Sequence, residues 1–373
     1  MILASLHVVG CSGAAPPPPP PATSRPAAST APSSRPATAP AASRFEYHEV
    51  KLGSAFNLVL YAKDQATADA AARDAFALVD RLDLVFSDYN PQSELSLLGA
   101  RTREGPMPAP VDVSPDMIDL LLVAGRAAEL TGGLFDCSVG PYVQLWRRSK
   151  RLQQLPTPER LAEAKASVGW DKVALVPPEK PGGPGKVQLK AAKMRLDVGG
   201  IAGGYIADRV LALLRGRGVG QALVDSSGDL AVGDPPPGRA GWHVAIQSLA
   251  EPNKVVGYVE VANCGVSTSG DTYRFVEIDG VRYSHVLDPR TGLGLTHSVG
   301  VTVIARDGTT ADWVTKPISV LGAEKGLAFV EVLDAGGKVG PVGARVTTVG
   351  DDGKVNDAES KRYKQVIWAE RKP

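Results

Sequence analysis

The chain has 373 residues, of which 43% are hydrophobic, and its 41 Lys and Arg residues nearly balance its 40 Asp and Glu residues. A net charge of +1 without a basic cluster argues against a nucleic-acid-binding surface, so we expect no nucleic-acid partner. No apolar run approaches the roughly 20 residues that span a bilayer, which argues against a helical membrane domain.

Residues 1–11 are predicted to be a lipoprotein-type signal segment. The letters VVGC at residues 8–11 resemble a bacterial lipoprotein cleavage box, after which Cys11 becomes the lipidated first residue. The leader is short and lacks the basic start of secretory leaders, so an upstream start or a chance match stays open. We expect a lipid anchor on Cys11 and a location in the bacterial cell envelope, facing the periplasm. The outer membrane is slightly favoured because Ser12 does not look like an inner-membrane retention signal.

Residues 12–44 are predicted to be a disordered tether. Pro, Ala, Ser and Thr dominate this segment, which includes an unbroken run of prolines at residues 16–21. Such a composition cannot bury a core, and proline-rich chains are extended. The composition changes after residue 44, and we expect one folded domain over residues 45–373.

Periodicity predicts helices mainly in the first half of this domain and strands mainly in the second. Helices are expected over residues 67–86, with Thr67 as a cap, and from Ser114-Pro115 to Gly132-Gly133, from Thr157-Pro158, and over residues 310–321. Strands are expected over residues 48–61, 187–196, 222–225, 242–247, 255–261, 273–278, 281–286 and 298–304, with a loop at 87–95 and a hairpin or insertion at 177–186. This pattern favours a single large α+β domain with mixed or antiparallel sheets flanked by helices.

A glycine-rich segment, DVGGIAGGYIAD at residues 197–208, joins a predicted strand to a predicted helix. Unpaired N–H groups at a helix N-terminus attract phosphate, and glycine lets a ligand approach the backbone closely. Many such segments are only tight turns, so this one predicts a phosphate site weakly on its own. Neither the dinucleotide pattern GxGxxG nor a Walker loop, a zinc spacing or a Ser-His-Asp order is present.

Four further segments carry candidate chemistry. His285 lies in YSHVLDPRTG at residues 283–292, and its imidazole could accept a proton from a hydroxyl nucleophile, although a structural histidine is the alternative. Asp312 and Thr315 face the same way at a helix start, where their oxygens would suit Mg²⁺ or merely cap the helix. The segment STSGD at 267–271 could bind phosphate or simply form a turn, and the turn is favoured. The segment LFDCSVGP at 134–141 would be a loop on its own. Whether Cys137 and Cys264 pair is open, because pairing depends on geometry.

These motifs, in this order, resemble the FAD:protein FMN transferases, the ApbE family, over residues 47–322. The most specific matches are residues 197–208, 268–271, 283–292 and 311–322. The resemblance implies an ApbE-like fold, related to the T-fold. It also implies that FAD is the substrate, that FMN passes to a threonine of an acceptor protein, and that AMP leaves in a Mg²⁺-dependent phosphoryl-type transfer. The acceptor would be an envelope electron-transfer component.

The resemblance also assigns roles to individual residues. His285 would be the general base that acts on the acceptor threonine. The residues expected to contact FAD are Leu52, Tyr89, Asp136, Cys137, Ser138, Asp197, Gly203, Ser269 and Val286. Mg²⁺ would be held by the backbone carbonyl of Gly200 and by the side chains of Asp312 and Thr315.

Several positions depart from the family pattern, and three of them bear on the expected site. Leu52 replaces a methionine, Gly203 replaces a Lys or Glu that contacts FAD, and Lys316 replaces a metal-binding threonine. Either Lys316 turns away, or the metal is held differently, or the ammonium supplies part of the charge that Mg²⁺ supplies elsewhere. Two other functions stay open. One is an FAD pyrophosphatase that gives FMN and AMP, because the same site would serve hydrolysis. The other is a flavin-binding lipoprotein without catalysis, which the departures at Gly203 and Lys316 support.

Overall fold

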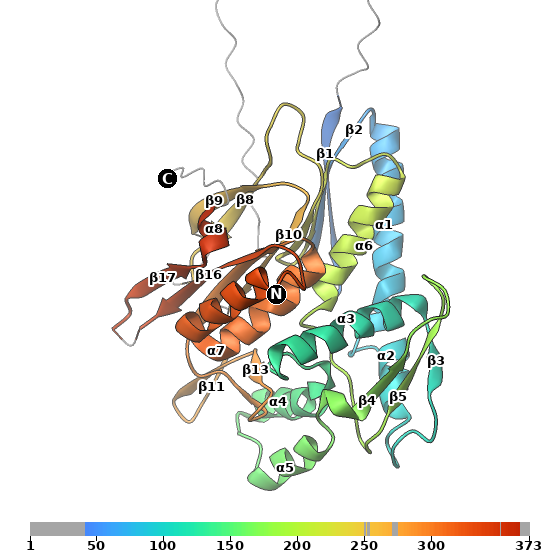
Figure 1. Cartoon of the computed structure of the whole chain (residues 1–373), viewed down its shortest axis with the longest axis vertical. Coiled ribbons are helices and arrows are strands. Elements are labelled where there is room, and N and C mark those ends of the chain that lie inside the picture. The colour runs from blue at the N-terminus through green and yellow to red at the C-terminus, as the bar shows by residue number, and fades with distance from the viewer. Residues whose placement is uncertain (1–41, 250, 252–253, 271–274, 351, 366–373) are drawn as a thin grey trace, which may run out of the picture.

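The computed structural model describes residues 42–249, 251, 254–270, 275–350 and 352–365 (Figure 1). The predicted signal segment with Cys11 and nearly all of the predicted tether therefore lie outside the described residues. In the described part, no helix combines the length and the apolar character needed to cross a bilayer. The first strand begins at Ser43, two residues before the predicted start of the folded domain.

An eight-stranded sheet forms the centre of the molecule, and every neighbouring pair of its strands is antiparallel. Its strands, in spatial order, are β1 (Ser43–Lys51), β2 (Ser54–Ala62), β6 (Ala222–Ser226), β7 (Asp229–Val232), β10 (Cys264–Gly270), β15 (Val299–Ala305), β16 (Val342–Val349) and β17 (Val355–Glu359). The predicted α+β architecture with antiparallel sheets flanked by helices is confirmed.

Three long helices cover one face of this sheet: α1 (Gln65–Phe86), α6 (Ala202–Gly216) and α7 (Gly308–Ala335). Figure 1 shows α1 and α6 side by side, with α7 crossing the strands next to them. The buried stripe of α1 includes Val79, Leu82 and Phe86, as its 3.6-residue period predicts. Its start was predicted wrongly, because the side chain of Asp64, not Thr67, caps the helix by accepting from the Thr67 N–H at 2.8 Å.

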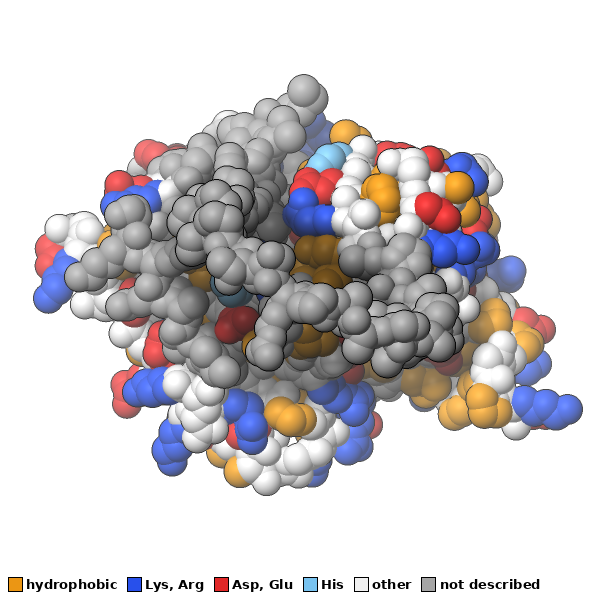
Figure 2. Space-filling model, turned by 90° about the horizontal axis from the view of Figure 1, so that it is seen from above, with side chains coloured by type: hydrophobic (Ala, Val, Ile, Leu, Met, Phe, Trp, Pro, Cys, Tyr) orange, Lys and Arg blue, Asp and Glu red, His pale blue; other side chains and the backbone are white. Residues whose placement is uncertain are grey.

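A two-stranded hairpin covers part of the opposite face. Its strands β8 (Trp242–Gln247) and β9 (Val255–Val261) have the predicted bounds, and their inward side chains pack on residues of the central sheet. The short helix α8 (Lys361–Gln365) adds a buried tyrosine to the same cluster. Around the outline of the face in Figure 2, acidic and basic side chains of the described residues are interspersed.

A helical region with a small sheet packs below the large sheet in the view of Figure 1. It contains α2 (Glu94–Ala100), α3 (Pro115–Thr131), α4 (Gly140–Leu152), α5 (Pro158–Ala166) and the strands β3 (Val111–Val113), β4 (Val173–Val176) and β5 (Gly185–Leu189), with short 3-10 turns η1 (Cys137–Val139) and η2 (Trp170–Lys172). The predicted starts of α3 and α5 are confirmed, because Ser114 and Thr157 accept from backbone N–H groups of the first turns. The sequence did not predict α2 and α4, since they begin in or beside segments rich in loop residues.

The glycine-rich segment differs from its prediction. The preceding strand β5 ends at Leu189, not near residue 196, and α6 begins at Ala202. Gly203 and Gly204 therefore lie inside the first turn of α6 rather than in the turn before it. A β carbon on Gly204 would lie 2.1 Å from the carbonyl oxygen of Gly308, so this glycine allows the first turns of α6 and α7 to touch backbone to backbone.

The remaining strands form two small hairpins, β11 (Phe275–Ile278) with β12 (Val281–Ser284), and β13 (Leu287–Asp288) with β14 (Leu293–Gly294). The predicted Asp279-Gly280 turn is confirmed, and both of its residues have positive φ, as a type I′ turn requires. Helix α7 extends beyond its predicted end at residue 321, with a break at Gly322, where φ is 75°.

Candidate active site

Two charged clusters meet at the glycine-rich segment. We call them the lysine cluster (Gly200, Gly204, Asp312, Thr315 and Lys316) and the arginine cluster (Asp88, Tyr89, Arg147 and Asp197). Their shared segment keeps them close, because the three peptide links from Asp197 to Gly200 span at most about 11 Å. All three predicted metal ligands belong to the first cluster, and two predicted FAD contacts belong to the second.

The lysine cluster is built on the first turns of α7. The side chain of Asp307 caps this helix by accepting from the Thr310 N–H at 2.7 Å. Positions 312, 315 and 316 then fall on one side of the helix, since residues three and four apart are neighbours. The Lys316 ammonium donates to Asp312 Oδ1 at 2.9 Å and to Thr315 Oγ1 at 2.8 Å. Asp312 is 1% exposed, so this ion pair is largely shielded from water.

The glycine-rich segment completes the lysine cluster from the side of α6. The Gly204 N–H donates to Asp312 Oδ2 at 3.2 Å, so the Asp312 carboxylate links the starts of both helices. A β carbon on Gly200 would lie 3.2 Å from Lys316 Cε, which places the lysine stem against the Gly200 backbone. The structure thus brings Gly200, Asp312 and Thr315 together, as the resemblance implies, but they surround the side chain of Lys316.

This arrangement does not fit a Mg²⁺ ion between Asp312 and Thr315. Their oxygens already accept from the ammonium, and a second cation at ~4 Å would be repelled by on the order of 4 kcal/mol per unit charge at an intermediate effective dielectric. Within the described ranges, no group of three or more His, Cys, Asp or Glu side chains could hold a metal ion. Of the three possibilities left by the sequence, Lys316 turning away is not what the structure has.

Asp229 is a site residue that the sequence reasoning missed. Its Oδ1 accepts from the Ser267 hydroxyl at 2.6 Å, and its Oδ2 would lie 2.4 Å from a β carbon on Gly203. The carboxylate therefore fills the space that a side chain at position 203 would need. Burial, and after it the charge of Asp312, raises the pKa of Asp229 to about 7, although the Lys316 ammonium lowers it. In the sequence, Asp229 follows the turn residues SSG at 226–228, and this position did not indicate a role in the site.

Ser269 lies on β10, two residues beyond Ser267. Side chains two apart on a strand share a face, so Ser269 shares the face from which Ser267 bonds to Asp229. Ser269 is buried, while the intervening Thr268 is exposed and its hydroxyl lies 3.2 Å from that of Thr302. Asp271, the last residue of the STSGD motif, lies outside the described residues. The role of Ser269 toward FAD stays a prediction.

The arginine cluster centres on Arg147 of α4. Its guanidinium donates to Asp88, lies 4.0 Å from Asp197 Oδ2, and places Cζ 4.0 Å from the centre of the Tyr89 ring. Burial raises the pKa of Asp197 to about 6, and the nearby charge of Asp88 adds to this shift. Arg147 therefore connects two predicted FAD contacts, Tyr89 and Asp197. The sequence missed it because α4 itself was not predicted.

The segment 136–138 holds the backbone of Asp197 by a hydrogen bond. The Cys137 carbonyl accepts from the Asp197 N–H at 2.7 Å. Asp136 accepts from the Ser138 N–H at 2.7 Å and the Trp170 N–H at 3.1 Å, and the Ser138 hydroxyl accepts from the Gly169 N–H at 2.7 Å. These side chains hold the local backbone, and their contact with FAD stays a prediction. Cys137 is a buried free thiol whose pKa is raised by burial.

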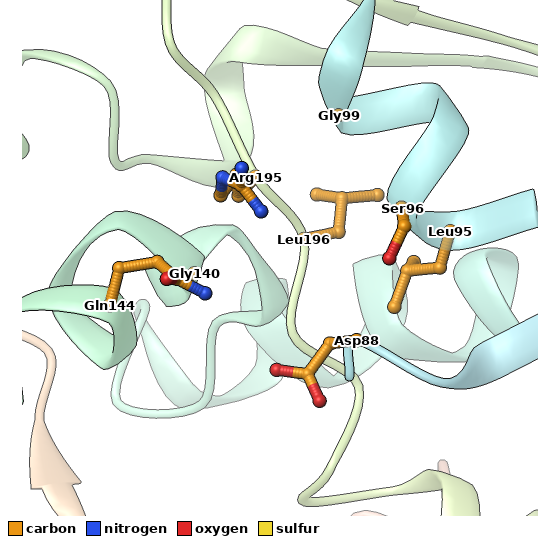
Figure 3. Close-up of a pocket in the computed structure, with 8 residues that line it drawn as sticks. All are labelled: Asp88, Leu95, Ser96, Gly99, Gly140, Gln144, Arg195 and Leu196. Carbon is orange, nitrogen blue, oxygen red and sulfur yellow. The ribbon is translucent and has the colours of Figure 1, made fainter. Parts of the chain in front are cut away.

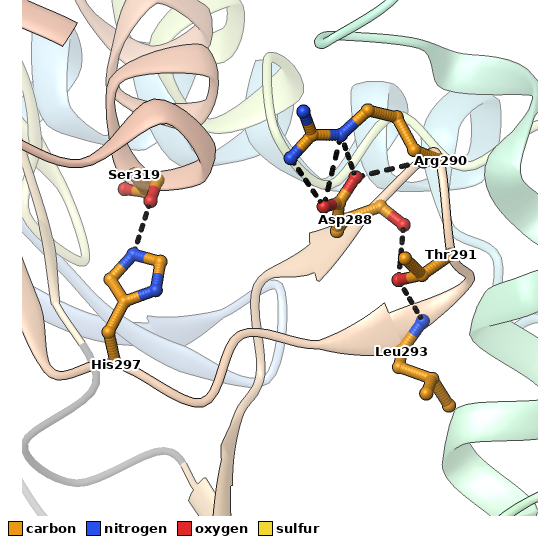
Figure 4. Close-up of polar contacts among 6 residues, drawn as sticks. All are labelled: Asp288, Arg290, Thr291, Leu293, His297 and Ser319. Atoms are coloured by element: carbon orange, nitrogen blue, oxygen red, sulfur yellow. Dashed lines mark hydrogen bonds and ion pairs between the residues drawn. The ribbon is translucent and has the colours of Figure 1, made fainter. Parts of the chain in front are cut away.

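His285 lies in the loop between β12 and β13, and it is exposed. The following residue, Val286, donates its N–H to Ser284 Oγ at 3.1 Å. Further along, Asp288 is paired with Arg290, whose Nη2 lies 2.7 Å from Oδ2, as Figure 4 shows. The imidazole of His297 lies 2.8 Å from the Ser319 carbonyl oxygen of α7 (Figure 4). The segment that follows His285 is thus attached to the helix that carries Lys316.

Leu52 occupies the tip of the β1–β2 hairpin. It and Gly53 both have positive φ, at 54° and 73°, which gives the two-residue turn favoured between antiparallel strands. The Leu52 side chain is exposed at this tip. The hairpin is held to α1 by Lys51, whose ammonium lies 2.7 Å from Asp80 Oδ1.

Two cavities lie near these residues, and neither includes His285 or Lys316. The cavity in Figure 3 has a volume of about 10 Å³, enough for one water molecule, and touches the arginine cluster only at Asp88. An open groove of about 440 Å³ lies between α6 and the start of α7, where Asp208 and Thr309 line it. Asp208 accepts from the N–H groups of Gly308 and Thr309, so it caps α7 beside that groove.

Known proteins share both the sequence and the fold. The ApbE family model matches residues 52–338. An FAD:protein FMN transferase of Treponema pallidum (strain Nichols) is 34% identical over 293 residues, covering 76% of this chain and 80% of its own. An enzyme of the same name from Haemophilus influenzae is 31% identical over 274 residues, covering 71% and 77%.

Solved structures agree with this match. The structure described as flavin transferase ApbE from Vibrio cholerae has a TM-score of 0.74 and 25% sequence identity, and the match covers 87% of this chain and all of that one. The apbe protein from Thermotoga maritima has a TM-score of 0.72 and 26% identity, covering 87% and 99%. The likeness therefore extends over the folded domain as a whole.

Proposed function

Because this chain belongs to the ApbE family, we propose that it transfers FMN from FAD to a threonine side chain of an acceptor protein and releases AMP. One observation carries the proposal. Residues from distant parts of the chain, Gly200 on one side and Asp312 and Thr315 on the other, converge on a single cation, Lys316. A fixed positive charge at a helix start suits the pyrophosphate of a dinucleotide.

The proposed reaction is a phosphoryl-type transfer. The threonine Oγ attacks the phosphorus of the FMN half of FAD, a new P–O bond forms, and the P–O bond to AMP breaks. The threonine hydroxyl proton leaves to a base, and AMP departs with the bridging oxygen. The reaction needs no oxidant or reductant, since FAD and the threonine supply every atom of both products. Catalysis then depends on positioning and on neutralising charge on the phosphates.

The chain offers a residue for each part of this reaction. His285 would accept the threonine proton, and its exposed loop would admit an acceptor protein. The Lys316 ammonium would neutralise charge on the pyrophosphate, beside the N-terminal turn of α6. Tyr89, with 79% of its surface exposed, would offer a ring to the flavin while Arg147 lies against it.

The lysine cluster leaves no place for the magnesium ion that the resemblance implies. The resemblance implies a Mg²⁺ ion on Gly200, Asp312 and Thr315, but the oxygens of the last two accept from Lys316. No step of the proposed reaction therefore uses a metal ion. An acceptor from an envelope electron-transfer system remains part of the proposal.

The test is to incubate the full chain with FAD and a protein domain that carries a candidate acceptor threonine, with and without Mg²⁺. We expect AMP in solution and a flavin-fluorescent acceptor band on a denaturing gel. AMP without the band would replace transfer by FAD hydrolysis. Bound FAD with neither product would make the chain a flavin-binding protein and overturn the proposal.

The base is tested with His285→Ala and a matched control, His243→Ala. His243 lies on β8, where its imidazole is 3.6 Å from Glu260 and away from the proposed site. We expect His285→Ala to slow labelling by roughly 10²-fold or more, a typical effect of losing a general base, while His243→Ala labels at the parental rate. Parental labelling by His285→Ala would remove His285 from this role.

We also propose that Cys11 carries a lipid that anchors the chain to the envelope, facing the periplasm. The VVGC sequence and the proline-rich segment after it support this proposal. Radiolabelled palmitate supplied to cells that express the full chain should label it, and Cys11→Ser should abolish both the label and recovery in the membrane fraction. Equal membrane recovery of the two proteins would contradict the anchor.

A further inference from the structure

The Lys316 ammonium occupies the place at which the resemblance predicts a divalent cation. Its Nζ lies 2.9 Å from Asp312 Oδ1 and 2.8 Å from Thr315 Oγ1, the two side-chain oxygens assigned to the metal. Its stem lies along Gly200, the third assigned residue. One lysine therefore binds both assigned side-chain oxygens and packs against the residue whose carbonyl was the third assigned ligand.

The surroundings of Lys316 hold it in this place. A β carbon on Gly200 would lie 3.2 Å from Lys316 Cε and 3.5 Å from the Phe135 ring, so the glycine makes room for the lysine stem. Phe135 in turn packs near Trp313 of α7, with ring centres 6.1 Å apart. Only 21% of the Lys316 side chain is exposed. The ammonium is thus part of the packed site and not a mobile surface charge.

Lys316 keeps one donor for a ligand. An ammonium has three N–H donors, and within the described part of the chain its hydrogen bonds to Asp312 and Thr315 use two. The Lys316 side chain as a whole is 21% exposed, so it is not fully enclosed by protein. A phosphate oxygen is a strong acceptor for such a donor.

We propose that Lys316 is a built-in cation that neutralises the pyrophosphate of FAD, so that flavin transfer by this chain needs no divalent cation at the lysine cluster. This inference rests on the proposed function and specifies its charge partner. A simpler alternative is that Lys316 only neutralises the buried Asp312 carboxylate. That alternative predicts loss of stability without Lys316 but leaves the metal requirement of the reaction unchanged.

The first experiment uses the unaltered full chain, so no variant has to fold. The protein is stripped with EDTA and a chelating resin, and AMP release and acceptor labelling are measured in EDTA and in Mg²⁺. We expect rates that agree within about twofold, because the cation is covalently attached. Loss of activity in EDTA with full recovery in Mg²⁺ would overturn the proposal.

Three variants separate charge supply from structural support. Lys316→Thr restores the expected metal ligand, and we expect it to lose roughly 10-fold or more in EDTA and to recover with Mg²⁺. Lys316→Met should lose about 10²-fold under both conditions. The matched control Lys325→Met changes an exposed lysine on the same helix and should behave as the parent. Parental rates from folded Lys316→Met in EDTA would favour the simpler alternative and overturn the proposal.

A binding measurement separates this inference from the proposed function. Mn²⁺ is titrated by calorimetry into the parent and into Lys316→Thr, each without FAD. We expect one more saturable site in Lys316→Thr than in the parent, because the ammonium no longer holds Asp312 and Thr315. If no protein releases AMP or labels the acceptor, the proposed function fails, and this titration still decides the role of Lys316. Equal numbers of Mn²⁺ sites in the two proteins would overturn the inference.

Discussion

In each of the two clusters beside the glycine-rich segment, one cation is paired with carboxylates, but the two cations differ in their exposure to water. In the arginine cluster, one half-exposed guanidinium lies between Asp88 and Asp197 and against an exposed tyrosine ring. In the lysine cluster, one ammonium lies on the buried Asp312 and on Thr315, inside the contact between two helix starts. Water screens the first cluster much more than the second.

Because of this difference, we expect substitutions in the two clusters to change the free energy of unfolding by different amounts. A partly solvated ion pair contributes little to stability, whereas breaking a buried pair leaves an uncompensated charge. The lysine cluster should therefore resist substitution because the fold depends on it. In the arginine cluster, the exposed Tyr89 should tolerate substitution in stability while ligand binding changes. Four predictions test this contrast, beginning with the largest effect.

Asp312→Ala should destabilise the fold by about 3–5 kcal/mol, because it leaves the Lys316 ammonium and the Gly204 N–H without their carboxylate. Urea unfolding followed by circular dichroism measures the change. Asp312→Asn keeps an acceptor for the Gly204 N–H and should cost less. If Asp312→Ala lowers the free energy of unfolding by less than about 1 kcal/mol, the pair of Asp312 and Lys316 is effectively solvated. The two clusters would then not differ in their contribution to stability.

Asp197→Asn should flatten the pH dependence of stability in the arginine cluster. The raised pKa of about 6, against an ordinary value of 3.8, means that the folded state keeps a proton that the unfolded state releases first. Stability from this group is therefore present at low pH and falls, by about 2 kcal/mol, between roughly pH 4 and pH 7. Urea unfolding across this range should show that fall in the parent and not in Asp197→Asn. Asp112→Asn, at an exposed carboxylate, is the control and should leave the slope unchanged.

Gly203→Ala should cost about 1–2 kcal/mol, because its β carbon would lie 2.4 Å from Asp229 Oδ2 and push on the neighbour of the lysine cluster. Gly216→Ala at the other end of α6 is the matched control, since nothing lies within 4 Å of its β carbon. That control should be neutral or slightly stabilising, because alanine favours helix. Equal stabilisation by both changes would show that Asp229 moves away freely.

Tyr89→Ala should change stability by less than about 0.5 kcal/mol, because the ring is mostly exposed. The same change should weaken FAD binding by roughly 5- to 10-fold, which corresponds to about 1 kcal/mol, if the ring lies along the flavin. Quenching of flavin fluorescence measures the affinity. Tyr89→Phe keeps the ring and should bind as the parent; weaker binding by Tyr89→Phe would assign the effect to the hydroxyl.

The sequence predicted the fold best where local chemistry is strong. The caps at Ser114 and Thr157, the Asp279-Gly280 turn and the bounds of β8 and β9 follow from side-chain and backbone preferences of neighbouring residues. It failed for α4, whose start lies in a glycine- and proline-containing segment, and for the end of β5, where alternation continues after pairing stops.

The candidate site was predictable only in part. Gly200, Asp312 and Thr315 were expected to meet, and they do, since the motif order of a family carries information on contacts that local spacing lacks. Asp229 and Arg147 could not be found in this way. Their roles depend on pairing across the sheet and on an unpredicted helix, both of which join residues far apart in sequence.

The first strand has a consequence for how the protein behaves at high concentration. Among the described residues, strand β1 lies at one edge of the eight-stranded sheet, and an edge strand is a place where strands of other molecules can add. Its nine residues include Arg44, Glu46, Glu49 and Lys51, so charges of both signs line the edge. Another strand that docks there would have to bring its own matching charges into register. Charged side chains along an edge strand therefore disfavour the addition of a strand from another molecule.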